Sequence, residues 1–83
     1  MNRIEALGAV IRDTRLRLNI SQEKLAETAK LHRNGLGRIE RSEVVVTVGT
    51  LWLIADALKV PASELMHRAD VLAQKGDTDL RTT

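Results

Sequence analysis

A short stretch near the middle of the chain carries cationic and amide side chains at a spacing that suits contact with nucleic acid. If this stretch is helical, Leu36 and Ile39 form its buried side and the polar side chains point outward. Arg33 could then grip guanine O6 and N7 with two hydrogen bonds, and Asn34 could pair with adenine. Arg38, one turn further along, is either a third base reader or a phosphate clamp. The pattern predicts a DNA-reading helix; the alternative is that these cations only make a surface soluble.

The segment just before this stretch has the pattern of another amphipathic helix. Leu25, Ala26 and Ala29 fall on one face at helical spacing, and Ser21 is placed to cap the start. Leu31 closes the turn between the two segments. Two short helices joined by a tight turn, the second of them cationic, are typical of a helix-turn-helix.

The run from Ser21 to Glu40 resembles the helix-turn-helix of the Xre family, the lambda-repressor-like DNA-binding proteins. The resemblance lies in its Ser-Gln start, its Leu-Ala pair and the Ile-Glu-Arg sequence at its end. The Leu31-His32-Arg33 turn is similar to that of the controller proteins of restriction–modification systems. The similarity extends from about Val10 to Met66. It implies an all-α, compact five-helix domain.

The resemblance also implies a function. A protein of this family would bind a palindromic operator in double-stranded DNA as a homodimer and regulate transcription, including that of its own gene. The expected setting is a restriction–modification operon, with a phage- or plasmid-type repressor as the other choice. RNA polymerase stays open as a further partner. The alternative function is that of the antitoxin in a toxin–antitoxin pair built on the same fold.

Three residues receive roles from this resemblance. Arg15 would pair with Glu40 at the end of the recognition helix, and a planar guanidinium can donate two hydrogen bonds to a carboxylate. Both residues are therefore assigned to the architecture of the domain. Gln22 would contact a DNA phosphate from the N-terminus of its helix, and the alternative is a surface Gln without a partner.

The turn and the recognition helix depart from the common pattern. Lys30 stands where many helix-turn-helix proteins have Gly, and a non-Gly residue in a left-handed conformation costs about 1 kcal/mol. Lys30 and Arg41 are expected phosphate contacts, and His32 could cap the helix weakly or touch phosphate. Gly35 and Gly37 each cost about 1 kcal/mol inside a helix. Close approach to DNA at Gly35, and to a neighbouring helix at Gly37, would explain them; the alternative is that the fold simply tolerates both glycines.

Three other helices follow from apolar periodicity. The first covers about residues 3–18, with a buried stripe of Ile4, Leu7, Ile11, Thr14 and Leu18. Thr47 is a candidate N-cap for a helix that ends near Leu58, and Pro61 opens the last one. Between the recognition helix and Thr47, the sequence Val44-Val45-Val46 suits an edge strand or an extended loop. We expect one domain over residues 1–74.

The helix that ends near Leu58 is apolar on most sides, more than one small core requires. Trp52, the sole aromatic residue, suits either a core or the centre of an interface. A homodimer accounts for this surplus of apolar surface. The expected interface consists of Trp52, Leu53, Leu65, Ala69 and Leu72. From residue 75 to residue 83 polar residues dominate, and we expect a flexible tail.

The charge is distributed unevenly along the 83 residues. Residues 1–41 hold nine Lys or Arg and five Asp or Glu, a net charge of +4, whereas residues 42–83 hold four and six, a net charge of −2. The simpler explanation is that the charged residues of both halves are only solvated surface residues. Because the basic half coincides with the helix-turn-helix pattern, we expect it to attract phosphate.

The composition gives no support to an enzyme. Cysteine is absent and His32 lies far from His67 in the chain, so no metal site is expected. No serine belongs to a recognisable catalytic motif, and no Walker-type glycine loop is present, so we expect no cofactor and no small-molecule ligand. Neither a signal peptide nor a membrane-spanning segment is predicted. We expect a cytoplasmic, nucleoid-associated protein.

Overall fold

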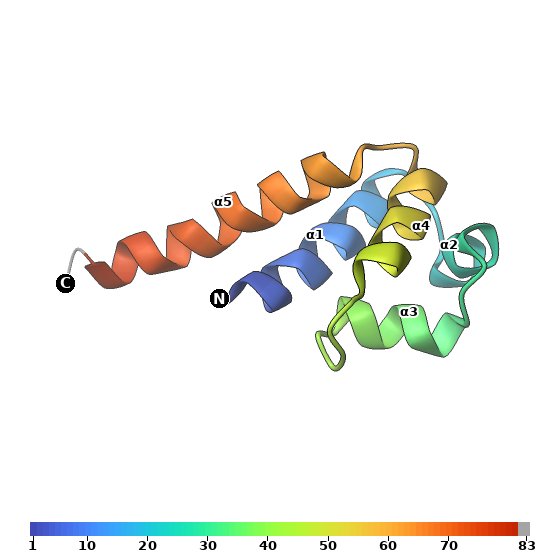
Figure 1. Ribbon diagram of the computed structural model, residues 1–83, viewed down its shortest axis with the longest axis horizontal. Coiled ribbons are helices and arrows are strands. Elements are labelled where there is room, and N and C mark those ends of the chain that lie inside the picture. Colours follow the sequence, from blue (N-terminus) through green and yellow to red (C-terminus); the bar gives the residue numbers. More distant parts are fainter. Residues whose placement is uncertain (82–83) are drawn as a thin grey trace.

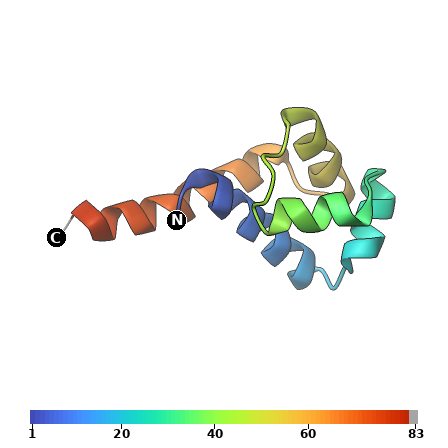
Figure 2. The same ribbon diagram turned by 90° about the horizontal axis from the view of Figure 1, so that it is seen from below.

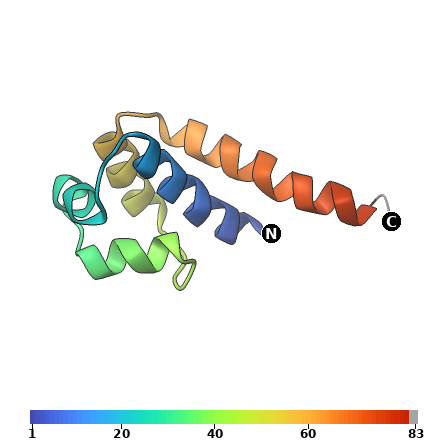
Figure 3. The same cartoon turned by 180° about the vertical axis from the view of Figure 1, so that it is seen from behind.

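The computed structural model describes residues 1–81 and contains five helices (Figure 1). They are α1 (Arg3–Arg17), α2 (Gln22–Ala29), α3 (Arg33–Glu40), α4 (Val48–Leu58) and α5 (Ala62–Arg81). No strand occurs within the described residues, which confirms the all-α prediction. Helices α2, α3 and α4 gather toward the C-terminal end of α1, and α5 runs antiparallel beside α1 and extends past its start (Figures 1 and 3).

Side-chain caps define the starts of α1, α2 and α4. Ser21 Oγ accepts a hydrogen bond of 3.0 Å from an amide in the first turn of α2, and Thr47 Oγ1 accepts one of 3.1 Å in α4. Both caps were predicted from the sequence and are confirmed. At α1, Asn2 and Glu5 form a capping box in which each side chain accepts from the other residue's backbone amide.

The buried face of α1 differs from the predicted stripe. Leu7, Ile11 and Thr14 are buried as expected, but Ile4 and Leu18 are exposed. The reason is that α1 packs against both α3 and α5, so two neighbours decide which arc of the helix is covered. The buried arc therefore includes Ala6, Gly8, Val10 and Arg15, which the single predicted stripe left out.

Lys30 adopts the left-handed conformation that its place in the turn requires, with φ of 61°. Its amide donates to carbonyls of the last turn of α2, and the Leu31 amide donates to the Ala26 carbonyl at 2.8 Å. These bonds satisfy carbonyls at the end of α2 that the helix itself leaves free. The turn thus keeps the usual geometry without glycine, at a cost of about 1 kcal/mol.

The core is built from all five helices, and α5 contributes Leu65, Ala69 and Ala73 to it. Leu65 is 0% exposed and Ala69 is 3% exposed, so neither is available to a partner chain. The prediction that these two residues form a dimer interface is wrong. They repeat every four residues along α5 and form the stripe that faces its own domain. Leu72 is half-buried, whereas Trp52 and Leu53 are exposed.

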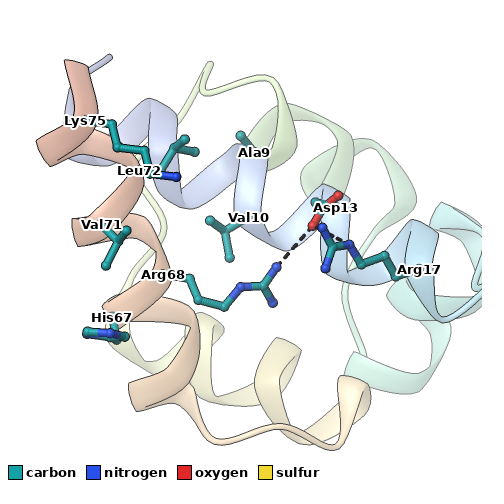
Figure 4. A pocket seen from close by; sticks show the side chains of 9 residues that line it. All are labelled: Ala9, Val10, Asp13, Arg17, His67, Arg68, Val71, Leu72 and Lys75. Atoms are coloured by element: carbon teal, nitrogen blue, oxygen red, sulfur yellow. Dashed lines mark hydrogen bonds and ion pairs between the residues drawn. The ribbon is translucent and has the colours of Figure 1, made fainter. Parts of the chain in front are cut away.

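Arg68 ties α5 to α1 across a groove of about 610 Å³ (Figure 4). Its Nη1 donates to Thr14 Oγ1 at 2.9 Å, and its Nη2 donates to Asp13 Oδ2 at 3.1 Å. Arg17 also pairs with Asp13, at 3.0 Å. One carboxylate of α1 therefore holds a cation from its own helix and another from α5.

Helix α5 continues to Arg81, so the backbone is helical through most of the expected tail. The rest of that tail, residues 82–83, lies outside the described residues. The domain boundary at residue 74 stays a prediction. The Val44-Val45-Val46 segment forms a loop before α4 and not a strand. Among residues 1–81, no helix is both long enough and apolar enough to cross a membrane.

Gly8 brings α1 into backbone contact with the end of α3. A Cβ at Gly8 would lie 2.6 Å from the Ile39 carbonyl oxygen and 3.0 Å from that of Glu40. This close approach was not predicted from the sequence. At Gly37 the nearest atom to a Cβ is Arg41 Nη1 at 3.0 Å, and at Gly35 nothing lies within 4 Å.

We predict opposite effects for the same substitution at two helical glycines. Gly8→Ala should lower the free energy of unfolding by about 1–3 kcal/mol, because the new methyl group meets backbone that cannot easily move. Gly35→Ala should raise it by about 0.5–1 kcal/mol, because alanine favours a helix and the space is open. Urea unfolding followed by circular dichroism measures both. Equal stability of Gly8→Ala and the unmodified chain would contradict the close approach of α1 and α3.

Candidate nucleic-acid interface

Helix α3 presents its polar side chains to solvent and its apolar ones to the core. Arg33, Asn34 and Arg38 are exposed, while Leu36 and Ile39 are buried. Seen from below, α3 lies at the front of the domain and no other helix covers it (Figure 2). The outward side of α3 is therefore free to enter a groove of DNA.

A buried ion pair fixes α3 to α1. Arg15 Nε donates to Glu40 Oε2 at 2.7 Å, and its Nη2 donates to Glu40 Oε1 at 3.0 Å. The two side chains are 8% and 1% exposed. Arg15 Nη1 also donates to the Ile20 carbonyl at 2.9 Å, which anchors the connection between α1 and α2. This is the two-bond geometry that a guanidinium and a carboxylate form best.

Gln22 joins the same pair. Its Nε2 donates to Glu40 Oε1 at 2.9 Å, so the first residue of α2 is tied to the last residue of α3. Gln22 was expected either to contact a phosphate or to be a surface Gln without a partner, and neither prediction includes this bond. Gln22 and Glu40 lie 18 residues apart in the chain, and no local pattern links them.

The other predicted backbone contacts lie around the ends of α3. Lys30, His32 and Arg41 are exposed, and Gly35 borders a hollow of about 350 Å³ between α3 and the loop before α4. His32 occupies the N-cap position of α3, but its side chain makes no capping hydrogen bond. Cationic side chains thus lie next to both ends of α3.

Each exposed arginine near α3 has a carboxylate neighbour. Arg33 lies 3.9 Å from Glu23, a loose contact, whereas Arg41 Nε lies 2.6 Å from Glu43 Oε2. Arg38 also approaches Glu43, at 4.0 Å. The hydrogen bond from Arg41 lowers the pKa of the Glu43 carboxyl, and the same contact raises the pKa of Arg41.

Glu43 was not predicted from the sequence as part of this site. It follows the recognition helix and stands two residues after Arg41, which is not the three- or four-residue spacing of ion pairs within a helix. The contact forms because Ser42 turns the chain with φ of 62°, and the Glu43 amide then donates to the Arg38 carbonyl at 2.8 Å. No cluster of three His, Cys, Asp or Glu side chains that could hold a metal ion occurs in the part of the chain that the structure describes.

Two short helices joined by a tight turn, with the second helix exposing cations and an amide, define a DNA-binding helix-turn-helix domain. The helix-turn-helix family model HTH_3 matches residues 11–65. The chain belongs to this family, of the Xre-like type, whose members are transcriptional regulators that bind double-stranded DNA.

Similar proteins include controllers of restriction–modification systems. The control protein C.SmaI of Serratia marcescens is 39% identical over 72 residues, which cover 87% of this chain and 86% of that protein. The crystal structure of the restriction–modification controller C.AhdI from Aeromonas hydrophila matches with a TM-score of 0.73 and 31% identity, over 75% of this chain and 94% of that one. The clp gene regulator ClgR of Corynebacterium glutamicum matches with a TM-score of 0.87 and 25% identity, over 99% and 89% of the two chains.

We predict that the buried pair is essential for stability. Arg15→Met should cost about 3–5 kcal/mol of unfolding free energy, because it leaves the Glu40 carboxylate buried without its cation. Arg12→Met is the matched control, since Arg12 is exposed on the same helix and its loss should change stability by less than about 0.5 kcal/mol. Urea unfolding measures both. The combined variant Arg15→Met, Glu40→Leu should recover part of the loss; equal costs for Arg15→Met and Arg12→Met would rule out the pair as a main support.

Proposed function

We propose that the protein is a sequence-specific transcriptional regulator that binds a palindromic operator as a homodimer and controls its own synthesis. The observation that carries this proposal is the uncovered side of α3, where Arg33, Asn34 and Arg38 are exposed together. The matched controllers C.SmaI and C.AhdI support a restriction–modification operon as the setting, with a phage- or plasmid-type repressor as the other. In either setting RNA polymerase is a further proposed partner.

The proposed readers of bases are Arg33, Asn34 and Arg38. Side chains near the N-terminus of a recognition helix reach base edges in the major groove, where Arg suits guanine and Asn suits adenine. Contacts to bases carry the sequence information. The specificity of the protein would therefore depend on two turns of α3.

The proposed phosphate contacts surround these readers and position α3 on the duplex. They are Gln22, Lys30, His32, Gly35 and Arg41. Gln22 can serve both its partner and DNA, since a side-chain amide has two N–H donors and Glu40 takes one of them. The open space at Gly35 would allow the backbone of α3 to approach the duplex closely.

We predict that selection from random duplexes at a stated salt concentration yields a palindrome with half-sites about 34–36 Å apart. Arg33→Ala should weaken binding to the selected site by about 1–3 kcal/mol and relax the preference at one base position. Lys30→Ala should weaken binding to selected and scrambled duplexes alike. It should also reduce the slope of log affinity against log salt concentration by about one. Fluorescence anisotropy titrations measure the DNA affinity of the unmodified chain and of both variants. The absence of any consensus, with binding that vanishes as salt rises, would mean that α3 gives only non-specific attraction.

The proposed dimer surface is the outer face of α4, with Leu72 of α5 as a further contributor. On α4, Val48 is 62% exposed, Trp52 is 60% exposed and Leu53 is 43% exposed. Val48 and Trp52 lie one turn apart on the same side of the helix. Adjacent exposed apolar side chains of this size mark a surface that another protein covers. A second copy that meets this face would complete the homodimer.

We predict that Trp52→Glu weakens self-association by about tenfold or more, because it places a charge at the centre of the apolar face. Leu16→Glu is the control, since Leu16 is 50% exposed on α1, outside the proposed surface. Sedimentation equilibrium measures the dimer, and circular dichroism verifies that both variants fold. A monomeric protein at micromolar concentration would contradict the homodimer and favour the antitoxin function, in which a different protein covers α4.

A further inference from the structure

Glu43 lies in the loop that follows α3, and its carboxylate holds the guanidinium of Arg41. Arg41 Nε donates to Glu43 Oε2 at 2.6 Å, and Nη2 donates to Oε1 at a longer 3.5 Å. Arg38 Nε lies 4.0 Å from the same carboxylate. The Glu43 backbone is itself fixed, because its amide donates to the Arg38 carbonyl at 2.8 Å. The carboxylate is thus held between two of the cations that face DNA in the proposed function.

We propose that Glu43 is an intramolecular competitor of DNA phosphate: its carboxylate occupies Arg41 and attracts Arg38 when no DNA is bound, and so sets the affinity for the phosphate backbone. The proposal rests on the proposed function of α3 and adds to it a residue that regulates the same site. It concerns sequence-independent attraction, so its effect applies to every duplex.

The chemistry of the contact supports competition. A carboxylate and a phosphate present oxygens to the same N–H donors of a guanidinium, so Arg41 cannot fully satisfy both at once. The pair is open to solvent, with 58% of the Arg41 side chain and 49% of the Glu43 side chain exposed. Exposed pairs of this kind exchange partners at little cost. Arg41 can therefore leave Glu43 for a phosphate that comes within reach.

The contrast with Glu40 shows that the two carboxylates near the end of α3 do different things. Glu40 is buried, accepts from Arg15 and Gln22, and holds the helix in place. The ion pairs that the Glu43 carboxylate forms among the described residues are with the exposed Arg38 and Arg41. Removing the charge of Glu43 should thus change DNA affinity without changing the fold.

The salt dependence provides a second signature. When Arg41 moves to a phosphate, the DNA releases a counterion, but the abandoned Glu43 carboxylate attracts a cation from solution. The net release is then smaller than it would be without the carboxylate. A chain without this charge should show a steeper loss of affinity as salt rises.

The test compares Glu43→Gln with the unmodified chain on a selected operator duplex and on a scrambled one. Anisotropy titrations between about 50 and 200 mM salt give affinity and slope. We expect Glu43→Gln to bind both duplexes about fivefold more tightly at low salt, with a slope steeper by about one. Thermal unfolding should show no loss of stability, since the pair is exposed.

Two further variants separate competition from a general change of charge. Glu64→Gln removes the same charge from the first turn of α5, which lies on the opposite side of the domain from α3 (Figure 1). Because charges in physiological salt are screened beyond about 8 Å, this variant should bind DNA with nearly the same affinity as the unmodified chain. Adding Arg41→Gln to Glu43→Gln should remove most of the gain, because the released guanidinium is then absent.

The outcomes separate this inference from the proposed function. If the unmodified chain binds both duplexes equally, the proposed sequence-specific function fails, while the effect of Glu43→Gln can still be measured. If Glu43→Gln matches Glu64→Gln in affinity and slope, the competition is overturned. A gain on the operator alone would overturn it as well, because phosphate competition acts on any sequence. If none of the proteins binds DNA, both proposals fail.

Discussion

The contact between Arg15 and Glu40 is the constraint on which the remaining architecture depends. It joins the last turn of α1 to the last residue of α3, and Gln22 and the Ile20 carbonyl extend it to α2 and the preceding connection. Burying two charges is costly, and the cost is offset only when their donors and acceptors are satisfied. Within the part of the chain that the structure describes, no buried side-chain nitrogen or oxygen lacks a hydrogen-bond partner. The pair therefore specifies the orientation of α3.

The close approach at Gly8 and the buried pair act on the same end of α3. Gly8 lets the backbone of α1 reach the carbonyls of Ile39 and Glu40, and Arg15 grips the Glu40 side chain two turns further along α1. With its inner side held in this way, α3 leaves its outer side uncovered. The uncovered side of α3, which is the proposed interface with DNA, is thus a consequence of how α3 is anchored.

Two carboxylates that lie three residues apart near the end of α3 have different roles. Glu40 is enclosed and structural, whereas Glu43 is exposed and paired with arginines that face solvent. Burial separates these uses, because an enclosed ion pair is costly to break and an exposed one exchanges readily. The same principle divides the apolar residues: Leu65 stabilises its own domain, and Trp52 remains available to another chain.

Local signals in the sequence determined the helices, the caps at Ser21 and Thr47 and the cationic outer side of α3. These features depend on residues within four positions of one another, so periodicity and capping rules predict them. Tertiary structure decided the buried arc of α1, the core face of α5, the bond from Gln22 to Glu40, the approach at Gly8 and the position of Glu43 beside Arg41. Periodicity shows that a helix has an apolar face but not which neighbour covers it, and contacts between remote segments leave no local pattern. The family resemblance supplied the pairing of Arg15 with Glu40 across 25 residues, and only the folded chain revealed that Leu65 and Ala69 face inward.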